Sequence, residues 1–309
     1  MASLKETKGR IASVKSTLKI TSAMKMVASA KLHKAQNAIA NMTPYERKLR
    51  EMLQLLLASI QASEVGIPPQ KTSLIGGSPA EQDVFRGGMP AGKAGRVLIV
   101  AVASNSSLCG GFNGNVVREV KARINALKAE GREVDVISVG KKVADPLKKA
   151  GYPSPEDWSE LVAHPSYAMA DELAKKLQKA FDAGKYGLIE VIYNHFVSVG
   201  TQKVVRETYL PMAPLTAEGG TGRKWPDDII IEPSAEEMLA DLLPLVRSLR
   251  VYTVILDSVA SEHAARTVAM QTATDNGENI LQELTLEYNK GRQQKITSEI
   301  LDIVGGSMQ

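Results

Sequence analysis

The first 60 residues carry an apolar pattern with a period of seven. When a heptad starts at Leu4, thirteen of the seventeen a and d positions up to Ile60 hold apolar side chains. So long a stripe predicts a helix that packs along one face against a second helix, as in a coiled coil. The segment TPYE at 43–46 has a capping box with proline at the first helical position, so we expect a kink or a restart there.

A second helical pattern covers about 234–305, and Pro244 near its start is expected to interrupt it. Residues 1–51 hold 11 Lys and Arg against 3 Asp and Glu, a net charge of +8. Residues 233–309 hold 6 against 11, a net charge of −5. Segments of opposite charge pair well, so we expect the two terminal helices to lie together as an antiparallel pair.

Residues 96–210 alternate between strand and helix patterns. RVLIVAVAS at 96–104 is an almost continuous apolar run, typical of a buried parallel strand, and EVDVISVG at 133–140 is a second strand. Amphipathic helices are expected within 113–131, 141–151 and 167–184, and a hairpin from 188–198 and 203–211. The predicted fold class is α/β, a long antiparallel two-helix coiled coil with an inserted Rossmann-like domain.

These patterns divide the chain into five segments. They are an N-terminal coiled-coil helix at 1–61, a flexible Gly-, Pro- and Ser-rich linker at 62–95, an α/β globular domain at 96–214, a loop at 215–232, and a C-terminal coiled-coil helix at 233–309.

Composition limits the class of protein. Aromatic residues make up 5% of the chain, so the core must rest on aliphatic side chains. A single cysteine, Cys109, excludes an internal disulfide and fits a reducing compartment. The N-terminus lacks the apolar region of a signal peptide, and the longest apolar run, 97–103, is far below the roughly 20 residues of a membrane span. We expect any contact with a membrane to be made through partners.

The segment SNSSLCGGFNGN at 104–115 is the strongest candidate for chemistry. It follows a buried strand and precedes a helix, where a phosphate could bind, and a nucleotide-binding enzyme is one hypothesis. Its glycine spacing is not G-x-G-x-x-G, so a structural turn is favoured, with Cys109 a buried residue rather than a reactive thiolate. The four histidines show no metal-ligand spacing. We predict no catalytic, cofactor or metal site.

The basic N-terminal helix allows a second hypothesis, a coiled coil that binds nucleic acid through phosphate contacts. Its lysines alternate with the heptad stripe, and no aromatic residue precedes Tyr45. A solvated face that complements the acidic partner helix is therefore favoured.

Some apolar residues lie outside the heptad stripe. They are Met24, Met26, Val27 and Ala30. Near the C-terminus, five apolar residues are spaced so that they nearly circle the predicted helix: Ile296, Ile300, Leu301, Ile303 and Val304. A helix that is apolar all round is enclosed, and one partner helix cannot enclose it. Both ends of the chain are therefore expected to enter a sleeve made by other proteins.

Four segments resemble the gamma subunit of rotary F-type ATP synthases. They are RIASVKSTLKITSAMKMVASAKLHKAQ, SLCGGFN, SEHAARTVAMQTATDN and LTLEYNKGRQQKITSEILDIVGG, and the resemblance runs nearly end to end. The chain departs from the family at SNSSLCGG, which lacks an Asp and a basic residue, at the GGSMQ end, and in its longer 62–95 linker.

The resemblance implies a rotor shaft without catalytic site or cofactor. Its two helices would turn inside the ring of alpha and beta subunits. Its globular domain and the epsilon subunit would sit on the membrane c-ring, peripherally at the cytoplasmic face of a bacterial inner membrane. The resemblance also implies coupling contacts: Met24 and Lys25 with an acidic loop of the beta subunit, and Arg292, Gln293, Thr297 and Glu299 with catch loops of the ring.

Overall fold

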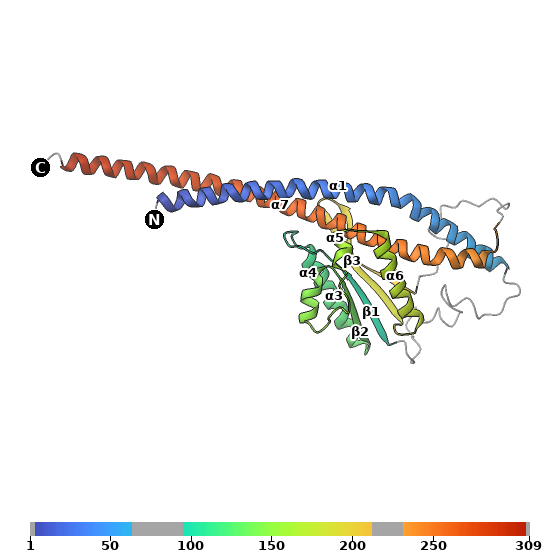
Figure 1. Cartoon of the computed structure of the whole chain (residues 1–309). Helices are drawn as coiled ribbons and strands as arrows, with labels where there is room; N and C mark the ends of the chain where they lie inside the picture. Colours follow the sequence, from blue (N-terminus) through green and yellow to red (C-terminus); the bar gives the residue numbers. More distant parts are fainter. Residues whose placement is uncertain (1–3, 64–94, 212–230, 307–309) are drawn as a thin grey trace.

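The computed structural model describes residues 4–63, 95–211 and 231–306 (Figure 1). The predicted linker at 62–95 and the predicted loop at 215–232 lie almost wholly outside these ranges.

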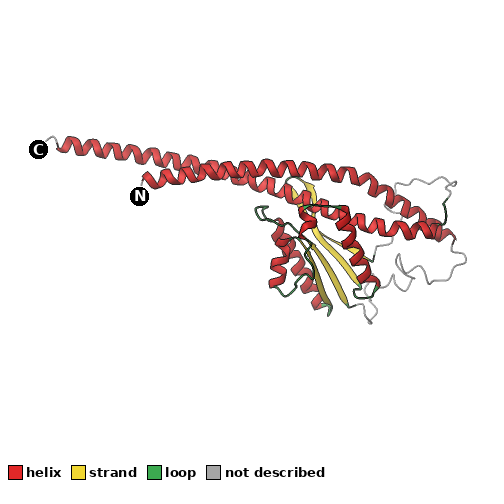
Figure 2. Cartoon of the chain, viewed as in Figure 1, coloured by secondary structure: helices red, strands yellow, loops and turns green. Residues whose placement is uncertain are grey.

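Two long helices from opposite ends of the chain lie side by side, and we call the pair the shaft. Helix α1 spans Leu4–Ser63 and helix α7 spans Ala235–Gly306 (Figures 1 and 2). The hydroxyls of Thr21 and Thr274 form a hydrogen bond of 2.9 Å, and Glu46 forms an ion pair with Arg250. The later residue of α1 thus contacts the earlier residue of α7, so the two helices are antiparallel.

The heptad pattern of α1 forms the seam between the two helices. Every described side chain at a predicted a or d position of α1 is buried or half-buried, which confirms that part of the prediction. On α7, half-buried positions recur at alternating spacings of three and four residues from Thr274 to Gly291. They are Thr274, Gly277, Leu281, Leu284, Tyr288 and Gly291.

Glycines on α7 let the helices approach closely. A Cβ atom added to Gly277 would lie 2.7 Å from Leu18 Cδ2, and one added to Gly291 would lie 3.2 Å from Leu4 Cδ2. These positions have no room for a side chain unless the opposite leucine moves.

Neither proline breaks its helix, so the restart expected at 43–46 and the interruption expected at Pro244 do not occur. α1 is continuous through Pro44, and the Thr43 hydroxyl donates to the Ile39 carbonyl over 2.9 Å, as a threonine inside a helix does. α7 is continuous through Pro244. An internal proline costs a helix about 3 kcal/mol, and burial of neighbours such as Leu243 and Leu249 outweighs that cost.

The inserted domain holds a four-stranded sheet in the order β2-β1-β3-β4. β1 is parallel to β2 and to β3, whereas β3 and β4 form an antiparallel hairpin. The strands are β1 Arg96–Val102, β2 Glu133–Val139, β3 Leu188–Ser198 and β4 Thr201–Leu210. The predicted Rossmann-like α/β class is confirmed.

Helices cover both faces of the sheet (Figure 2). They are α3 Phe112–Ala129, α4 Lys141–Lys149, α5 Ser159–Ala163 and α6 Tyr167–Asp182. One face packs on α3 and α4 through residues such as Val116, Val120 and Val143. The opposite face packs on α6 and on α7, whose Val254 and Ile255 belong to the same core as Val100 of β1. The shaft therefore supplies part of one layer of the domain.

The seam yields a prediction about Gly277. Replacing it by leucine should overfill the seam against Leu18 and lower the free energy of unfolding by about 1–3 kcal/mol. Thermal unfolding followed by circular dichroism measures the change.

The matched control is Gly9→Leu on α1, where an added Cβ meets nothing within 4 Å. There the helix should gain up to about 1 kcal/mol, because leucine has the better helix propensity. The double variant Leu18→Ala/Gly277→Leu should recover part of the loss. Equal stability of the Gly277 and Gly9 variants would contradict the close seam.

Candidate coupling surface

α7 continues past the start of α1. Gly291 lies opposite Leu4, where the described part of α1 begins, and α7 remains helical to Gly306 (Figure 1). Residues 292–306 therefore form a single helix about 22 Å long, beyond the described part of α1. We call this segment the tip.

The tip presents large apolar side chains to solvent. Leu301 is 65% and Ile303 71% exposed, and Ile296, Ile300 and Val304 are also exposed. Their spacing spreads them around more than one face of the helix. An isolated helix of this length is marginal in water, and exposed apolar side chains in such number mark a contact surface.

The polar residues that the resemblance assigned to the tip are also exposed. These are Arg292, Gln293, Thr297 and Glu299. The Thr297 hydroxyl donates to the Gln293 carbonyl over 2.9 Å, and Glu299 lies 3.6 Å from Lys295 in an ion pair one turn away. Both interactions lie within the tip and leave its outer surface accessible to another protein.

Met24 and Lys25 lie on α1, in a second place on the shaft. Both are half-buried, whereas their neighbours Met26 and Val27 are 65% and 57% exposed. Thr21, one turn before Lys25, is hydrogen-bonded to Thr274 of α7. Thr274 lies about 27 Å from Arg292 along α7, so Met24 and Lys25 are far from the tip. The structure thus places the six predicted contact residues in two separate groups, and their roles stay a prediction.

The loop after β1 lies against α7. Arg266 Nη2 donates to the Ser106 hydroxyl over 2.6 Å and to the Ser107 carbonyl over 3.4 Å, while Nη1 pairs with Glu262 at 2.7 Å. A Cβ added to Gly110 in this loop would meet Ala269 of α7 at 4.0 Å. The loop thus packs on the shaft and helps to hold the domain there, which favours the structural interpretation of SLCGGFN.

Cys109 in this loop is buried, with 1% of its surface exposed. Burial raises the pKa of its thiol, which works against a thiolate at neutral pH. Asn113 Nδ2 donates to the Cys109 sulfur over 3.1 Å, and the Ser104 hydroxyl lies 3.8 Å from it. The surroundings are those of a packed cysteine.

A second attachment of the domain to the shaft lies at the end of β3. Asp257 of α7 accepts a hydrogen bond from the Phe196 backbone N–H at 2.8 Å, and its other oxygen lies 2.5 Å from His195 Nδ1. Arg266 and Asp257 therefore hold two parts of the domain, the loop after β1 and the end of β3, on one helix. Sequence reasoning missed both contacts, because their partners are distant in the chain.

Two general findings concern the described residues. No group of three or more His, Cys, Asp or Glu side chains in these ranges is arranged to hold a metal ion. No helix in the same ranges is long and apolar enough to cross a membrane.

The fold and the exposed tip define an elongated shaft protein, built to contact other chains along a helical end. A family model described as ATP synthase matches residues 3–308. The chain is 48% identical to the ATP synthase gamma chain of Bacteroides thetaiotaomicron and 47% identical to that of Phocaeicola vulgatus, over the full length of each pair. This chain belongs to the ATP synthase gamma chain family.

Solved structures of more distant proteins share the fold. The rotor of the Euglena gracilis mitochondrial ATP synthase matches with a TM-score of 0.58 at 19% identity, over 95% of this chain and 98% of that one. A chain of the Tetrahymena thermophila mitochondrial central stalk and c-ring matches with a TM-score of 0.53 at 23% identity, over 82% and 99%.

His263 of α7, whose Nδ1 lies 3.4 Å from Arg266 Nη1, should make the stability of the fold depend on pH. Burial, aided by the nearby Arg266 charge, lowers the pKa of His263 from 6.5 to about 4. The unfolded chain therefore binds this proton more tightly than the folded chain, and stability falls as the pH drops from 6.5 towards 4. At pH 5 the loss should be about 1–2 kcal/mol, allowing for partial solvent screening.

His263→Gln should remove this component, so its melting temperature should fall less than that of the original chain between pH 7 and pH 5. Differential scanning calorimetry at both values measures the difference. His33→Gln, at an exposed position on α1, is the control. Parallel pH profiles for the original and His263 variant would contradict the assignment.

Proposed function

We propose that this chain is the central rotor shaft of a proton-translocating ATP synthase and carries no catalytic site of its own. The tip supports this most directly: it extends as a single helix with exposed apolar side chains. Such a surface requires an enclosing partner, and the family supplies one in the ring of alpha and beta subunits. Membership in the family favours this role over the nucleotide-binding and the nucleic-acid-binding hypotheses.

The shaft is suited to act by differential contact. One side is formed by α1, whose first 51 residues have a net charge of +8, and the other by α7, whose segment has a net charge of −5. A partner can change conformation only in response to contacts that differ between its states. An asymmetric shaft presents a different face to each catalytic beta subunit as it turns, and so favours a different state in each.

The remaining partners follow from the same proposal. The α/β domain, held to α7 by Arg266 and Asp257, would contact the epsilon subunit and the membrane c-ring. The protein would meet the membrane only through these partners, at the cytoplasmic face of a bacterial inner membrane. The solved relatives whose chains match include a rotor and a central stalk with its c-ring, which supports this arrangement.

The tip gives the first test. A chain that ends after Lys295 loses the apolar positions from Ile296 onward and should be held less firmly by the ring. Co-purification with tagged alpha and beta subunits should recover one copy of the original chain per three of each. Recovery of the shortened chain should fall at least tenfold, because burial of even one such side chain is worth about 1.5–3 kcal/mol and about 1.4 kcal/mol is a factor of ten.

The control is Leu301→Ala, which removes one exposed apolar side chain and should cause a smaller loss. Unchanged recovery of the shortened chain would argue against the sleeve. Failure of the full chain to co-purify would overturn the proposed function itself.

Met24 gives the second test. Met24→Lys places a charge beside Lys25 at the predicted sliding contact and should impair ATP-driven proton pumping about fivefold or more, while ATP hydrolysis changes less. The ratio of the two activities in membrane vesicles measures coupling.

Met52→Lys makes the same chemical change on α1 at a more distant exposed position and serves as the control. Equal losses of pumping and hydrolysis in the Met24 variant would contradict a coupling role.

A further inference from the structure

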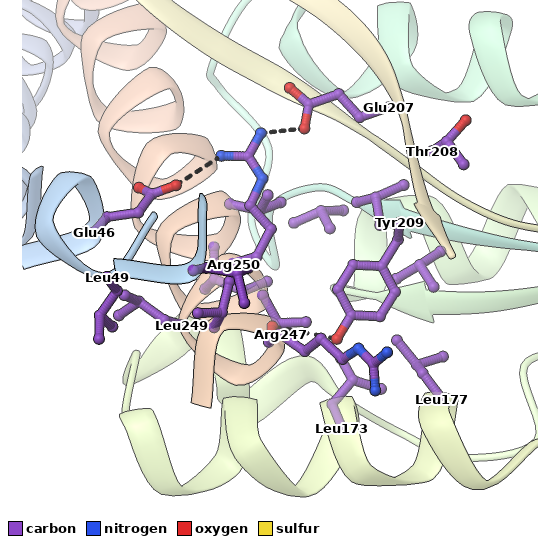
Figure 3. Close-up of a pocket in the computed structure, with 18 residues that line it drawn as sticks. Glu46, Leu49, Leu173, Leu177, Glu207, Thr208, Tyr209, Arg247, Leu249 and Arg250 are labelled. Atoms are coloured by element: carbon purple, nitrogen blue, oxygen red, sulfur yellow. Dashed lines mark hydrogen bonds and ion pairs between the residues drawn. The ribbon is translucent and has the colours of Figure 1, made fainter. Parts of the chain in front are cut away.

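A cavity lies between the shaft and the sheet, away from the tip. Its volume is about 360 Å³, and its walls come from α1, α6, α7 and three strands (Figure 3). An apolar cavity of about 150 Å³ holds a benzene molecule, so this one has room for a ligand about twice as large. It therefore has the size of a small-molecule site.

Most of the cavity wall is apolar. Thirteen of its eighteen lining residues have aliphatic or aromatic side chains, among them Leu49 of α1, Leu173 of α6 and Val254 of α7. An apolar ligand placed here would therefore exchange water for a hydrocarbon surface on most sides, which favours its binding.

The charged groups of the wall balance one another. The wall contains two arginines, Arg247 and Arg250, and two glutamates, Glu46 and Glu207. Arg250 forms ion pairs with both glutamates (Figure 3). Arg247 also has an interaction within the protein, so neither arginine is a free cation. The described residues of the wall thus offer a ligand no net charge with which to pair.

The surroundings of the cavity also disfavour charge. Burial raises the pKa of the Tyr209 hydroxyl and lowers the pKa of the Arg247 guanidinium, so both shifts favour the uncharged form. The Tyr209 hydroxyl donates to the Arg247 backbone carbonyl over 3.2 Å, which satisfies this donor within the protein. A charged ligand would be destabilised here in the same way, because it would lose water without gaining a free partner of opposite charge.

We propose that this cavity binds an uncharged, apolar molecule of about ten to fifteen non-hydrogen atoms, packed against Leu49, Leu173 and Val254. The ligand would contact α1, α7 and the domain at once, so its binding should stabilise the folded chain. This site is separate from the tip, and its binding chemistry does not depend on the proposed rotor role.

The probe is n-butylbenzene, titrated into the full-length chain by isothermal calorimetry. It should bind at one site per chain and raise the melting temperature. Two comparison probes, 4-phenylbutyrate and 4-phenylbutylamine, combine a similar apolar part with a negative or a positive charge. Each should bind about tenfold more weakly or worse, because its charge would be buried without a free partner.

Val254→Phe fills the cavity and should abolish the binding of n-butylbenzene. Val197→Phe is the matched control, because Val197 is 57% exposed near the end of β3 and is not part of the cavity wall. It should leave the affinity unchanged. Circular dichroism confirms folding of each variant. If Val254→Phe does not fold, Val246→Phe makes the same change at a half-buried position of the wall.

Binding of either charged probe as tightly as n-butylbenzene would overturn the proposal. So would n-butylbenzene binding that survives the filling variant in a folded chain, or that disappears when the chain ends after Lys295, since the probe would then be adsorbing to the tip. Absence of n-butylbenzene binding would equally overturn it. None of these outcomes would alter the co-purification expected for the proposed function.

Discussion

The rest of the structure depends on the packing of α7 against two partners at once. Between Arg247 and Ala264, most of the helix is buried, because α1 lies on one side and the sheet on another. From Thr274 onward only the seam with α1 remains, and after Gly291 only the tip. One helix thus passes through three environments in order. Its first part is mostly buried, its second part buries side chains only along the seam, and its last part exposes its apolar side chains.

The parts of the fold that local pattern determines were predictable from the sequence. The heptad of α1 and the apolar runs of the strands can be recognised within a short stretch of sequence, and each matches the structure. The restart expected at Pro44 and the interruption expected at Pro244 were wrong, because local preference was weighed without the tertiary contacts that oppose it, such as the burial of Leu243. α5 was missed because five residues are too few to show a helical period.

Of the candidate coupling surface, too, one part was predictable from the sequence and another was not. The apolar residues of the tip could be found because their spacing spreads them nearly all round the predicted helix, and the structure shows them exposed. The attachment of the domain through Arg266 and Ser106 joins residues 160 positions apart, and that through Asp257 and Phe196 joins residues 61 apart. No periodic pattern links such residues, so only the folded chain brings them together.

Beyond Gly291 the described part of the shaft changes from two helices to one, and this has a mechanical consequence. A single helix has an outer radius of about 5–6 Å. A pair of helices with axes about 8–10 Å apart reaches about 10 Å from the axis midway between them. Because the stiffness of a rod rises steeply with its thickness, the same load bends and twists the tip more than it bends and twists the pair.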